Sequence, residues 1–329
     1  MDTIIYKGRS IGEYQRVHIA LGNFDGVHLG HRRIIEELVK KSHQEQGTAV
    51  VATFDPHPLE VIRPQQPPKL ITPMKVKGEL FRRLGVDICL LFSFSDQMAQ
   101  LTAEDFVEIV LKEHLRCNSV MIGFNYSFGS KGLGTPTLLQ KLGKENGFNV
   151  KIMDAVTIDG IPVSSTNIRK ALLQGDVERA TQLLGYIPML TGKVVHGEKR
   201  GRQMGFPTIN LDLSKNQLLP QRGVYSAVAT FADKKDRYIA LVNIGVKPTF
   251  GCHRESVEAH LLDFRGDLYG QEVILHLIHF LRPEIAFGQV EELIAQIKKD
   301  STQTREYMKR IDQEFINEKL IDLHNRSTS

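Results

Sequence analysis

Short apolar runs alternate with amphipathic stretches along the first half of the chain, and this alternation limits the folds available to it. Four runs rich in Val, Ile, Leu and Phe are short enough to be buried strands, at 17–21, 48–54, 86–94 and 119–122. Residues 31–41 and 102–115 instead carry their apolar side chains on one helical face. Strands that alternate with helices form βαβ units, so we predict a parallel, doubly wound, Rossmann-like α/β sheet.

The pattern changes after Gly185. Strand-like runs then follow one another with Gly, Pro, Asp and Lys between them, at 194–195, 224–231, 238–244, 257–262 and 273–281. Short strands joined by turns predict a small antiparallel sheet or barrel, and helical periodicity returns near the C-terminus. Because Gly185 and Pro188 end the helical stretch 176–184, we expect two domains, 1–186 and 187–329.

Charge, hydropathy and cysteine content exclude several classes of protein. The 42 Lys and Arg against 38 Asp and Glu leave a net charge of +4, which suits anionic small substrates but is too small to indicate a nucleic-acid partner. No apolar run approaches the roughly 18 residues that cross a bilayer, and no signal peptide is recognisable, so we expect no membrane partner. Three cysteines without CxxC spacing predict a reducing, cytoplasmic location.

The string GNFDGVHLGH, residues 22–31, lies between the first predicted strand and the first predicted helix. Ligands bind at the carboxyl ends of strands in such folds, and glycines let the backbone approach a phosphate. His28 and His31 are three residues apart, so on a helical turn both face the same way and can stabilise charge on a phosphate during transfer. A His pair alone is also compatible with a surface position or half of a zinc site, although no further Cys or His ligands lie nearby.

A second glycine-rich segment, which is also basic, lies beyond residue 192. It is not a Walker A loop, because Gly197 is followed by Glu198. The PTIN that follows places Thr208 and Asn210 on one side of an extended strand, and their oxygens suit Mg²⁺. Phosphorylating an alcohol also requires a nearby carboxylate, for which one stretch offers Glu258, Asp263 and Asp267.

Further segments occur in the order typical of one enzyme family: TFDPHP (53–58), GFNYSFGSKGLGT (123–135), SSTNIR (164–169), GRQMGFPTINL (201–211), NIGVKPTF (243–250), VEAHLLDF (257–264) and FLRPE (280–284). Together with the HxGH string, they resemble the prokaryotic bifunctional riboflavin kinase/FAD synthetases over nearly the whole chain. The resemblance implies a Rossmann-like nucleotidylyltransferase domain, followed by a small antiparallel β-barrel riboflavin kinase domain with C-terminal helices. It implies phosphorylation of riboflavin to FMN and adenylylation of FMN to FAD, with ATP as co-substrate, Mg²⁺ as cofactor and pyrophosphate as a product.

For the first domain, the resemblance implies that His28 and His31 bind the ATP phosphates and stabilise the transition state. Further ATP contacts would come from Gly22, Phe24, Asp25, Gly26, Asn125, Ser164, Ser165, Thr166 and Arg169. The flavin side would hold Asp55, Pro56, His57, Pro58, Tyr126 and Phe128. Asn125 stands where many family members carry Asp. Taken alone, SSTNIR predicts only an ordinary helix cap.

For the second domain, the resemblance implies that Glu258 is the catalytic base. Asp263 and Asp267 better suit bracing the turn that follows. ATP contacts of the kinase would come from Gly197, Gly201, Arg202, Gly205 and Pro207, with Thr208 and Asn210 as metal ligands. Arg282 would meet flavin or phosphate, with a salt bridge to Glu284 as the alternative. Ile209 stands where the family usually has Ala and should point away from the metal.

Two other functions are compatible with parts of the sequence. A different HxGH transferase, such as a pantetheine-phosphate or nicotinamide-mononucleotide adenylyltransferase, would leave PTIN and VEAHLLDF unexplained. A flavin-binding or regulatory paralogue with reduced catalysis would be expected to lack His28, His31, Asn210 or Glu258, and all four are present. The expected partners are riboflavin, FMN and ATP, and a weak homo-oligomer is compatible with the sequence.

Overall fold

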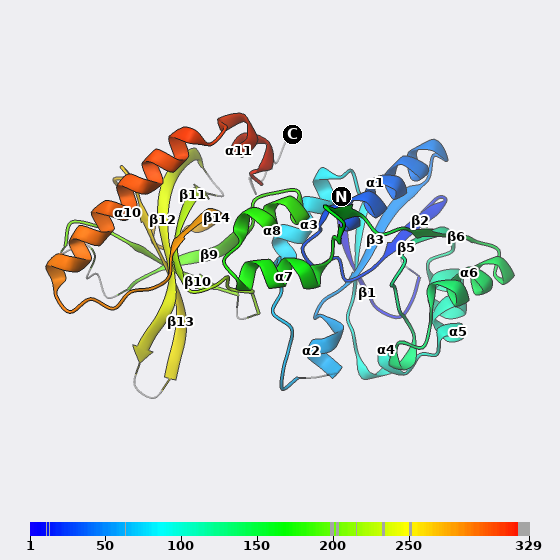
Figure 1. The fold of residues 1–329 in the computed structure, drawn as a ribbon. Coiled ribbons are helices and arrows are strands. Elements are labelled where there is room, and N and C mark those ends of the chain that lie inside the picture. The colour runs from blue at the N-terminus through cyan, green and yellow to red at the C-terminus, as the bar shows by residue number, and fades with distance from the viewer. Residues whose placement is uncertain are drawn as a thin grey trace. The chain divides into compact units, whose positions relative to one another are not determined.

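The computed structural model describes residues 1–321 except for 11, 13, 63, 198–200, 202–203, 215, 232–233 and 250–251. The chain divides into two compact units, Met1–Ser164 and Ser165–Ser329 (Figure 1). Helices α7 (Ser165–Leu173) and α8 (Val177–Leu184) therefore belong to the second unit by their contacts, whereas we expected them in the first. The assignment of one activity to each domain stays a prediction.

A six-stranded parallel sheet lies at the centre of the first unit, with strand order β1-β4-β3-β2-β5-β6. This confirms the predicted Rossmann-like fold. From β2 the chain turns to β3 on one side, and it later returns to β5 on the other, so the carboxyl ends of β2 and β5 form a topological switch point. The strands are β1 Asp2–Tyr6, β2 Val17–Leu21, β3 Thr48–Phe54, β4 Ile88–Phe92, β5 Cys117–Gly123 and β6 Asn149–Met153.

Helices connect these strands. Helix α1 (Leu29–Gln44) packs on β2, β3 and β5 (Figure 1). It buries Ile34, Ile35 and Leu38, as the amphipathic pattern predicts. The predicted helix 102–115 is present, but Phe106–His114 is π-helical. The remaining elements are α2 Pro58–Ile62, α3 Met74–Arg83, α4 Asp96–Gln100, α5 Ala103–Asp105, the 3₁₀ turn Ser130–Gly132, α6 Pro136–Glu145 and the hairpin β7 Thr157–Ile158 and β8 Ile161–Pro162; α1 spans Leu29–Gln44.

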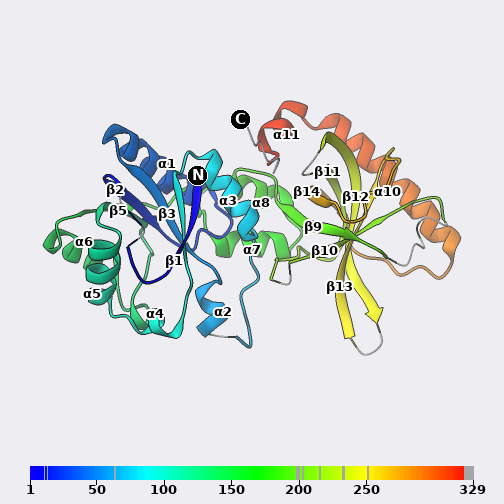
Figure 2. The same ribbon diagram turned by 180° about the vertical axis from the view of Figure 1, so that it is seen from behind.

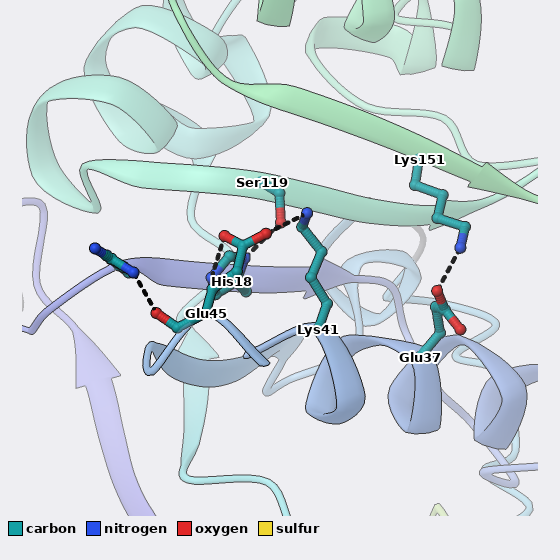
Figure 3. A network of polar contacts seen from close by, with 7 residues as sticks. His18, Glu37, Lys41, Glu45, Ser119 and Lys151 are labelled. Carbon is teal, nitrogen blue, oxygen red and sulfur yellow. Dashed lines mark hydrogen bonds and ion pairs between the residues drawn. The ribbon is translucent and has the colours of Figure 1, made fainter. Parts of the chain in front are cut away.

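A partly buried polar network joins the C-terminal end of α1 to the sheet (Figure 3). His18 is fully buried, and its Nδ1 lies 2.7 Å from Ser119 Oγ while its Nε2 lies 3.4 Å from Glu45 Oε2. Lys41 donates to Glu45 at 2.7 Å. Burial lowers the pKa of His18, which the Glu45 carboxylate partly offsets. Although a Ser, a His and a Glu also form hydrolase triads, Ser119 is only 3% exposed, so this network is structural.

The second unit contains a closed six-stranded barrel with strand order β10-β13-β12-β11-β14-β9, every pair antiparallel. This confirms the predicted barrel and its C-terminal helices. Helix α10 packs along the outside of the barrel against β12 (Figure 2). The elements are β9 Met189–Val195, β10 Ile209–Leu213, β11 Gly223–Phe231, β12 Lys234–Thr249, β13 Cys252–Leu261, β14 Glu272–Arg282, α10 Val290–Arg310 and α11 Gln313–Lys319.

Polar side chains fasten α8 and α10 to β14. His279 Nδ1 of β14 lies 2.5 Å from Glu178 Oε1 of α8, and its ring stacks on Tyr307 of α10 with 4.3 Å between centroids. Arg282 donates from Nε and Nη2 to Asp300, whose side chain is buried. The ion-pair partner of Arg282 is thus Asp300, not the Glu284 considered from the sequence. Among the described helices, none is both long and apolar enough to span a membrane.

Candidate active sites

The predicted residues of the first unit gather at the carboxyl edge of the parallel sheet. The loop 22–28 follows β2 and leads into α1, while Asp55 follows β3 and Asn125 follows β5. These three strands are neighbours and run in the same direction, so their carboxyl ends meet at one edge. This is the edge at which parallel α/β folds bind their ligands.

His28 and His31 form a stacked pair at the beginning of α1. His28 is the N-cap, and its Nδ1 accepts a hydrogen bond from the His31 backbone N–H at 3.3 Å. The two rings are 3.6 Å apart between centroids and 15° from parallel, so they face the same way as their spacing predicts. Gly30 leaves room for the pair, since a Cβ there would lie 3.2 Å from the His28 ring.

Both imidazoles are neutral near pH 7. Burial lowers the pKa of His28 to about 4. Burial also holds the pKa of His31 well below its ordinary value, helped by His28 and by the positive charge of Lys77. Because His28 Nδ1 accepts a hydrogen bond, its proton lies on Nε2. His31 Nδ1 is buried without a hydrogen-bond partner among the described residues, so the pair retains unused capacity for a ligand.

Phe24 and Asp25, both predicted to contact ATP, are buried. Phe24 packs edge-on against His31, with 5.2 Å between ring centroids. The Asp25 carboxylate accepts hydrogen bonds from the backbone N–H groups of Ile71 at 3.0 Å and Thr72 at 3.2 Å. The Gly26 N–H donates to Thr72 Oγ1 at 3.0 Å. Their role as ATP contacts stays a prediction, to which the structure adds the role of fixing the loop.

Lys77 is a buried residue at this site that the sequence analysis missed. It lies on α3 with 4% of its surface exposed, and its Nζ donates to the Asn23 carbonyl at 3.0 Å. Thr53 Oγ1 donates to the same carbonyl oxygen, also at 3.0 Å. No motif contains Lys77, and lysine on a helix normally indicates a solvated position.

The segment expected to lie on the flavin side contains both buried and exposed apolar side chains. Tyr126 and Phe128 stack with 5.9 Å between centroids, and Phe128 is part of the apolar core. Phe124 is 53% exposed and Leu133 is 74% exposed, so these two offer apolar surface that Phe128 does not. Neither was singled out from the sequence, although both lie within the motif GFNYSFGSKGLGT.

The remaining predicted contacts of the first activity are distributed as follows. Pro58 begins α2, and the preceding Asp55–His57 are partly or well exposed. Helix α7 begins at Ser165, so Thr166 and Arg169 lie on its first turns and belong to the second unit. Their assignment to ATP stays a prediction.

In the barrel, strand register aligns the residues predicted for the kinase. Asn210 on β10 lies opposite Glu258 on β13, and Glu258 lies opposite Asn243 on β12. Their neighbours on the other face, Leu211, Val257 and Ile244, are buried. Because side chains alternate between the faces of a strand, the three polar residues share one face and adjoin one another. Asn243 is an addition to the predicted set, although it lies within the motif NIGVKPTF.

The glycines predicted to contact ATP lie against the predicted metal ligands. A Cβ on Gly197 would lie 2.2 Å from Asn210 Nδ2, so a larger residue there would displace the Asn210 side chain. A Cβ on Gly201 would lie 2.5 Å from the Phe206 carbonyl oxygen and 3.2 Å from Thr208 Oγ1. The structure thus places Gly197 beside Asn210 and Gly201 beside Thr208, and the assignment of these glycines to ATP stays a prediction.

The remaining residues predicted to contact ATP in the kinase are Pro207, Gly205 and Arg202. Pro207 is exposed, and its carbonyl oxygen lies 2.8 Å from His260 Nδ1, a contact that the sequence analysis missed. Gly205 has φ +84, a backbone conformation that favours glycine. Arg202 lies outside the described residues.

Asp267 and Ile209 lie as expected from the sequence, whereas Asp263 makes a different contact. Asp267 Oδ1 accepts from the Tyr269 N–H at 2.9 Å, which braces the turn. Asp263 instead forms a two-pronged ion pair with Arg305 of α10. Ile209 lies opposite the buried Ala259, on the face away from Asn210.

The donor set near PTIN fits Mg²⁺ better than a metal held wholly by protein. The described residues contain no group of three or more His, Cys, Asp or Glu that could hold a metal ion. Mg²⁺ is usually held by a few protein oxygens, with phosphate and water completing its octahedron. The hydroxyl of Thr208 and the amide oxygen of Asn210 are donors of that kind.

Comparison with known proteins also divides the chain into an N-terminal and a C-terminal part. A family model for FAD synthetase matches residues 11–167, and one for riboflavin kinase matches residues 184–308. These matches define the class, an FAD synthetase part followed by a riboflavin kinase part. A bifunctional riboflavin kinase/FMN adenylyltransferase from Listeria monocytogenes is 40% identical over 298 residues, which covers 89% of this chain and 93% of the relative.

The enzyme of the same description from Escherichia coli K12 is 36% identical over 289 residues, covering 88% of this chain and 92% of its own. The chain belongs to the family of bifunctional riboflavin kinase/FMN adenylyltransferases. A crystal structure titled macrolide-efflux protein, from Streptococcus pneumoniae, has the same fold with a TM-score of 0.83 and 32% identity, covering 92% of this chain and 98% of that one. The riboflavin kinase match accounts for the half of the chain that another HxGH transferase would leave unexplained.

Proposed function

We propose that this chain phosphorylates riboflavin to FMN in its barrel unit and adenylylates FMN to FAD in its parallel-sheet unit, using ATP in both steps. The observation that carries the proposal is the stacked, neutral pair His28 and His31 at the switch point of the sheet, in a chain whose barrel separately aligns Asn210 with Glu258. We also propose a cytoplasmic location, since the substrates are cellular nucleotides and flavins.

In the adenylylation step, a phosphate oxygen of FMN attacks the α-phosphorus of ATP. The bond to the oxygen that bridges the α- and β-phosphorus breaks, and pyrophosphate leaves with that oxygen. Charge grows on the phosphate oxygens during this exchange. Neutral imidazoles of His28 and His31 donate N–H hydrogen bonds to it, and the N-terminus of α1 adds amide donors and a partial positive charge.

Other side chains bind and orient the two substrates in this step. Asn125, at the end of β5, supplies an exposed amide to the nucleotide. Exposed Phe124 offers an apolar surface for the flavin ring. We keep the family assignment of Ser164, Ser165, Thr166 and Arg169 to the triphosphate, and of Asp55, Pro56, His57, Pro58 and Tyr126 to the flavin side.

In the kinase step, the primary hydroxyl of riboflavin attacks the γ-phosphorus of ATP and ADP leaves. Glu258 accepts the hydroxyl proton, and Asn243 beside it on β12 orients the carboxylate. Gly197 and Gly201 let the backbone approach the ATP phosphates closely. Thr208 and Asn210 would hold Mg²⁺, which when bound neutralises charge on the transferring phosphate. Arg282 is engaged by Asp300, so we propose that it shapes the flavin site through that pair.

One assay separates this proposal from its alternative. The purified full chain is incubated with riboflavin and Mg-ATP, and FMN and FAD are followed by chromatography. Sequential appearance of FMN and then FAD supports the bifunctional enzyme. Flavin binding without either product would instead support a regulatory paralogue.

A further inference from the structure

The proposed adenylylation mechanism gives no role to the charge of Lys77, although this residue is buried beside the loop 22–28. The one described hydrogen bond of the Lys77 side chain goes to the Asn23 carbonyl, at 3.0 Å. Burial lowers the pKa of Lys77, whereas the charges of Asp25 and, more weakly, Asp55 act to raise it. A buried charge is costly, and replacing one with an apolar side chain of similar size is often neutral or stabilising. Stability alone therefore gives no reason for a lysine here.

The carbonyl that Lys77 holds lies at the start of a sharply bent backbone. Phe24 has φ +48, Gly26 has φ +86 and Val27 has φ +36, so two residues with side chains adopt the left-handed region within four positions. For Val27 this conformation is unusual, because its β-branched side chain crowds the backbone. Such strain persists only where surrounding contacts enforce it.

Contacts from three directions enforce this bend. Lys77 from α3 and Thr53 from β3 both donate to the Asn23 carbonyl. The Asp25 carboxylate is held by the backbone N–H groups of Ile71 and Thr72. The bend leads directly into His28, the N-cap whose ring stacks on His31.

We propose that Lys77 is a positioning residue for adenylyl transfer, acting through the Asn23 carbonyl on the loop that carries His28 and, through its charge, on His31. This inference rests on the proposed function of the His pair. Lys77 does not touch substrate. It maintains the bent loop that directs the two imidazoles and the first amides of α1 toward the phosphates.

The charge of Lys77 has a second effect, which a purely structural residue would not have. It lowers the pKa of His31, after the larger effects of burial and of His28. The other titratable groups facing Lys77 are Asp25 from the loop, Asp55 beyond β3 and Cys89 on β4. Without the ammonium group, the pKa of His31 rises. A proton on His31 then places a charge inside the buried stack with His28, and the activity falls on the acid side at a higher pH.

The test uses the full chain and measures both activities of each variant. Lys77→Met keeps length and removes the charge, and we expect it to lower kcat for FAD formation about tenfold or more, within the range for a displaced catalytic group. The acid limb of its pH–rate profile for FAD formation moves to higher pH. Riboflavin phosphorylation in the other unit stays at the wild-type rate. Lys77→Arg restores the position of the acid limb. Thr53→Val, which removes the other donor to Asn23, leaves the limb where it is in wild type.

A folded Lys77→Met with wild-type kcat and an unmoved acid limb would overturn the role of Lys77. If Lys77→Met also lost kinase activity, the variant would not have folded correctly, and Lys77→Gln is tested instead. Gln keeps a hydrogen-bond donor but has no charge. The proposal requires an upward shift of its acid limb, and an unmoved limb overturns it. A wild-type chain that made FMN but no FAD would overturn the proposed function of the His pair, and this inference with it.

Discussion

The two units build their candidate sites in different ways. In the parallel-sheet unit, the chemistry lies on the loop between β2 and α1, which buried side chains away from the reacting atoms hold in a bent form. In the barrel unit, Asn210, Glu258 and Asn243 lie on the strands themselves, where closure of the barrel already fixes their register. A loop site is therefore sensitive to its supporting residues, whereas a strand-face site is sensitive mainly to the residues that face the substrate.

The largest effect is expected at Glu258. Changing Glu258→Gln keeps the shape but removes the proton acceptor, so riboflavin phosphorylation should fall by about 10²- to 10⁴-fold. Conversion of supplied FMN to FAD should not change, and initial rates followed by chromatography measure both. Asp267→Asn is the control, because an amide oxygen can still cap the Tyr269 N–H. A near-normal Glu258→Gln would move the base to Asp263 or Asp267.

In the other unit, His28→Ala should lower FAD formation by about 10²- to 10³-fold, the range for losing one preorganised donor to a developing charge. FMN formation should be nearly intact. His43→Ala is the matched control, since His43 is an exposed residue on the same helix. If His28→Ala lost both activities while staying folded, the assignment of two separate sites would be wrong.

The boundary between the units can be tested by truncation. A fragment 165–329 retains α7 and α8, whereas a fragment 187–329 loses α8 with its fully buried Leu183 and Leu184. We expect the longer fragment to be more stable by about 3 kcal/mol or more, given about 1.5 to 3 kcal/mol for each buried leucine. Denaturant unfolding measures the difference.

Both fragments are then assayed with riboflavin and with FMN. The longer one should make FMN and no FAD. Equal stability of the two fragments would place the boundary at residue 186, as the sequence predicts. A folded fragment 165–329 without kinase activity would contradict the location of the kinase in the barrel.

A smaller effect is expected from Asn210→Ala. Loss of one oxygen donor should raise the Mg²⁺ concentration for half-maximal kinase activity on the order of tenfold. Ile209→Ala is the control, because Ile209 faces Ala259 on the other side of the strand. Unchanged Mg²⁺ dependence of Asn210→Ala would show that PTIN is only a strand edge.

The smallest effect concerns pH and the buried His18. Its pKa is lowered in the folded state, so below the unfolded value of about 6.5 the unfolded chain binds more protons and stability falls as pH falls. One such group changes the free energy of unfolding by at most about 1.4 kcal/mol per pH unit. His18→Gln should flatten this dependence between pH 7 and pH 5 in denaturant unfolding. An unchanged slope would show that the pKa of His18 does not differ between the folded and unfolded states.

Continuous apolar runs predicted most of the fold, and the omissions have physical causes. Strand β1 was missed because of its five residues only Tyr6 is buried, so its composition does not mark it as part of the core. Strand β6 likewise buries only Met153 fully. The apolar positions of 106–114 fit an α-helix or a π-helix equally well, because the two differ in hydrogen-bond register rather than in composition.

The residues of the candidate sites likewise divide into those that a sequence motif predicts and those that depend on tertiary contacts. The His pair, Asn210 and Glu258 were predictable because each lies in a motif whose residue types suit phosphate, metal or proton chemistry. Lys77 was not, since its burial depends on how α3 packs and its partner Asn23 lies 54 residues away. The partner of Arg282 also depends on tertiary contact, because Asp300 lies on a helix that the strand meets only after folding.

Buried side chains alternate along β13 with side chains on the kinase face. This alternation limits which mutations the kinase face can accept during evolution. Val257 and Ala259 are buried while Glu258 between them is on the other face, so deleting one residue upstream in the strand would turn Glu258 inward and expose its neighbours. Substitutions can adjust such a face one residue at a time, but a change in strand length rearranges the core and the candidate base together. Descendants of this chain should therefore vary in the lengths of the barrel turns that carry no site residue, and in their strands only by exchange of residue for residue.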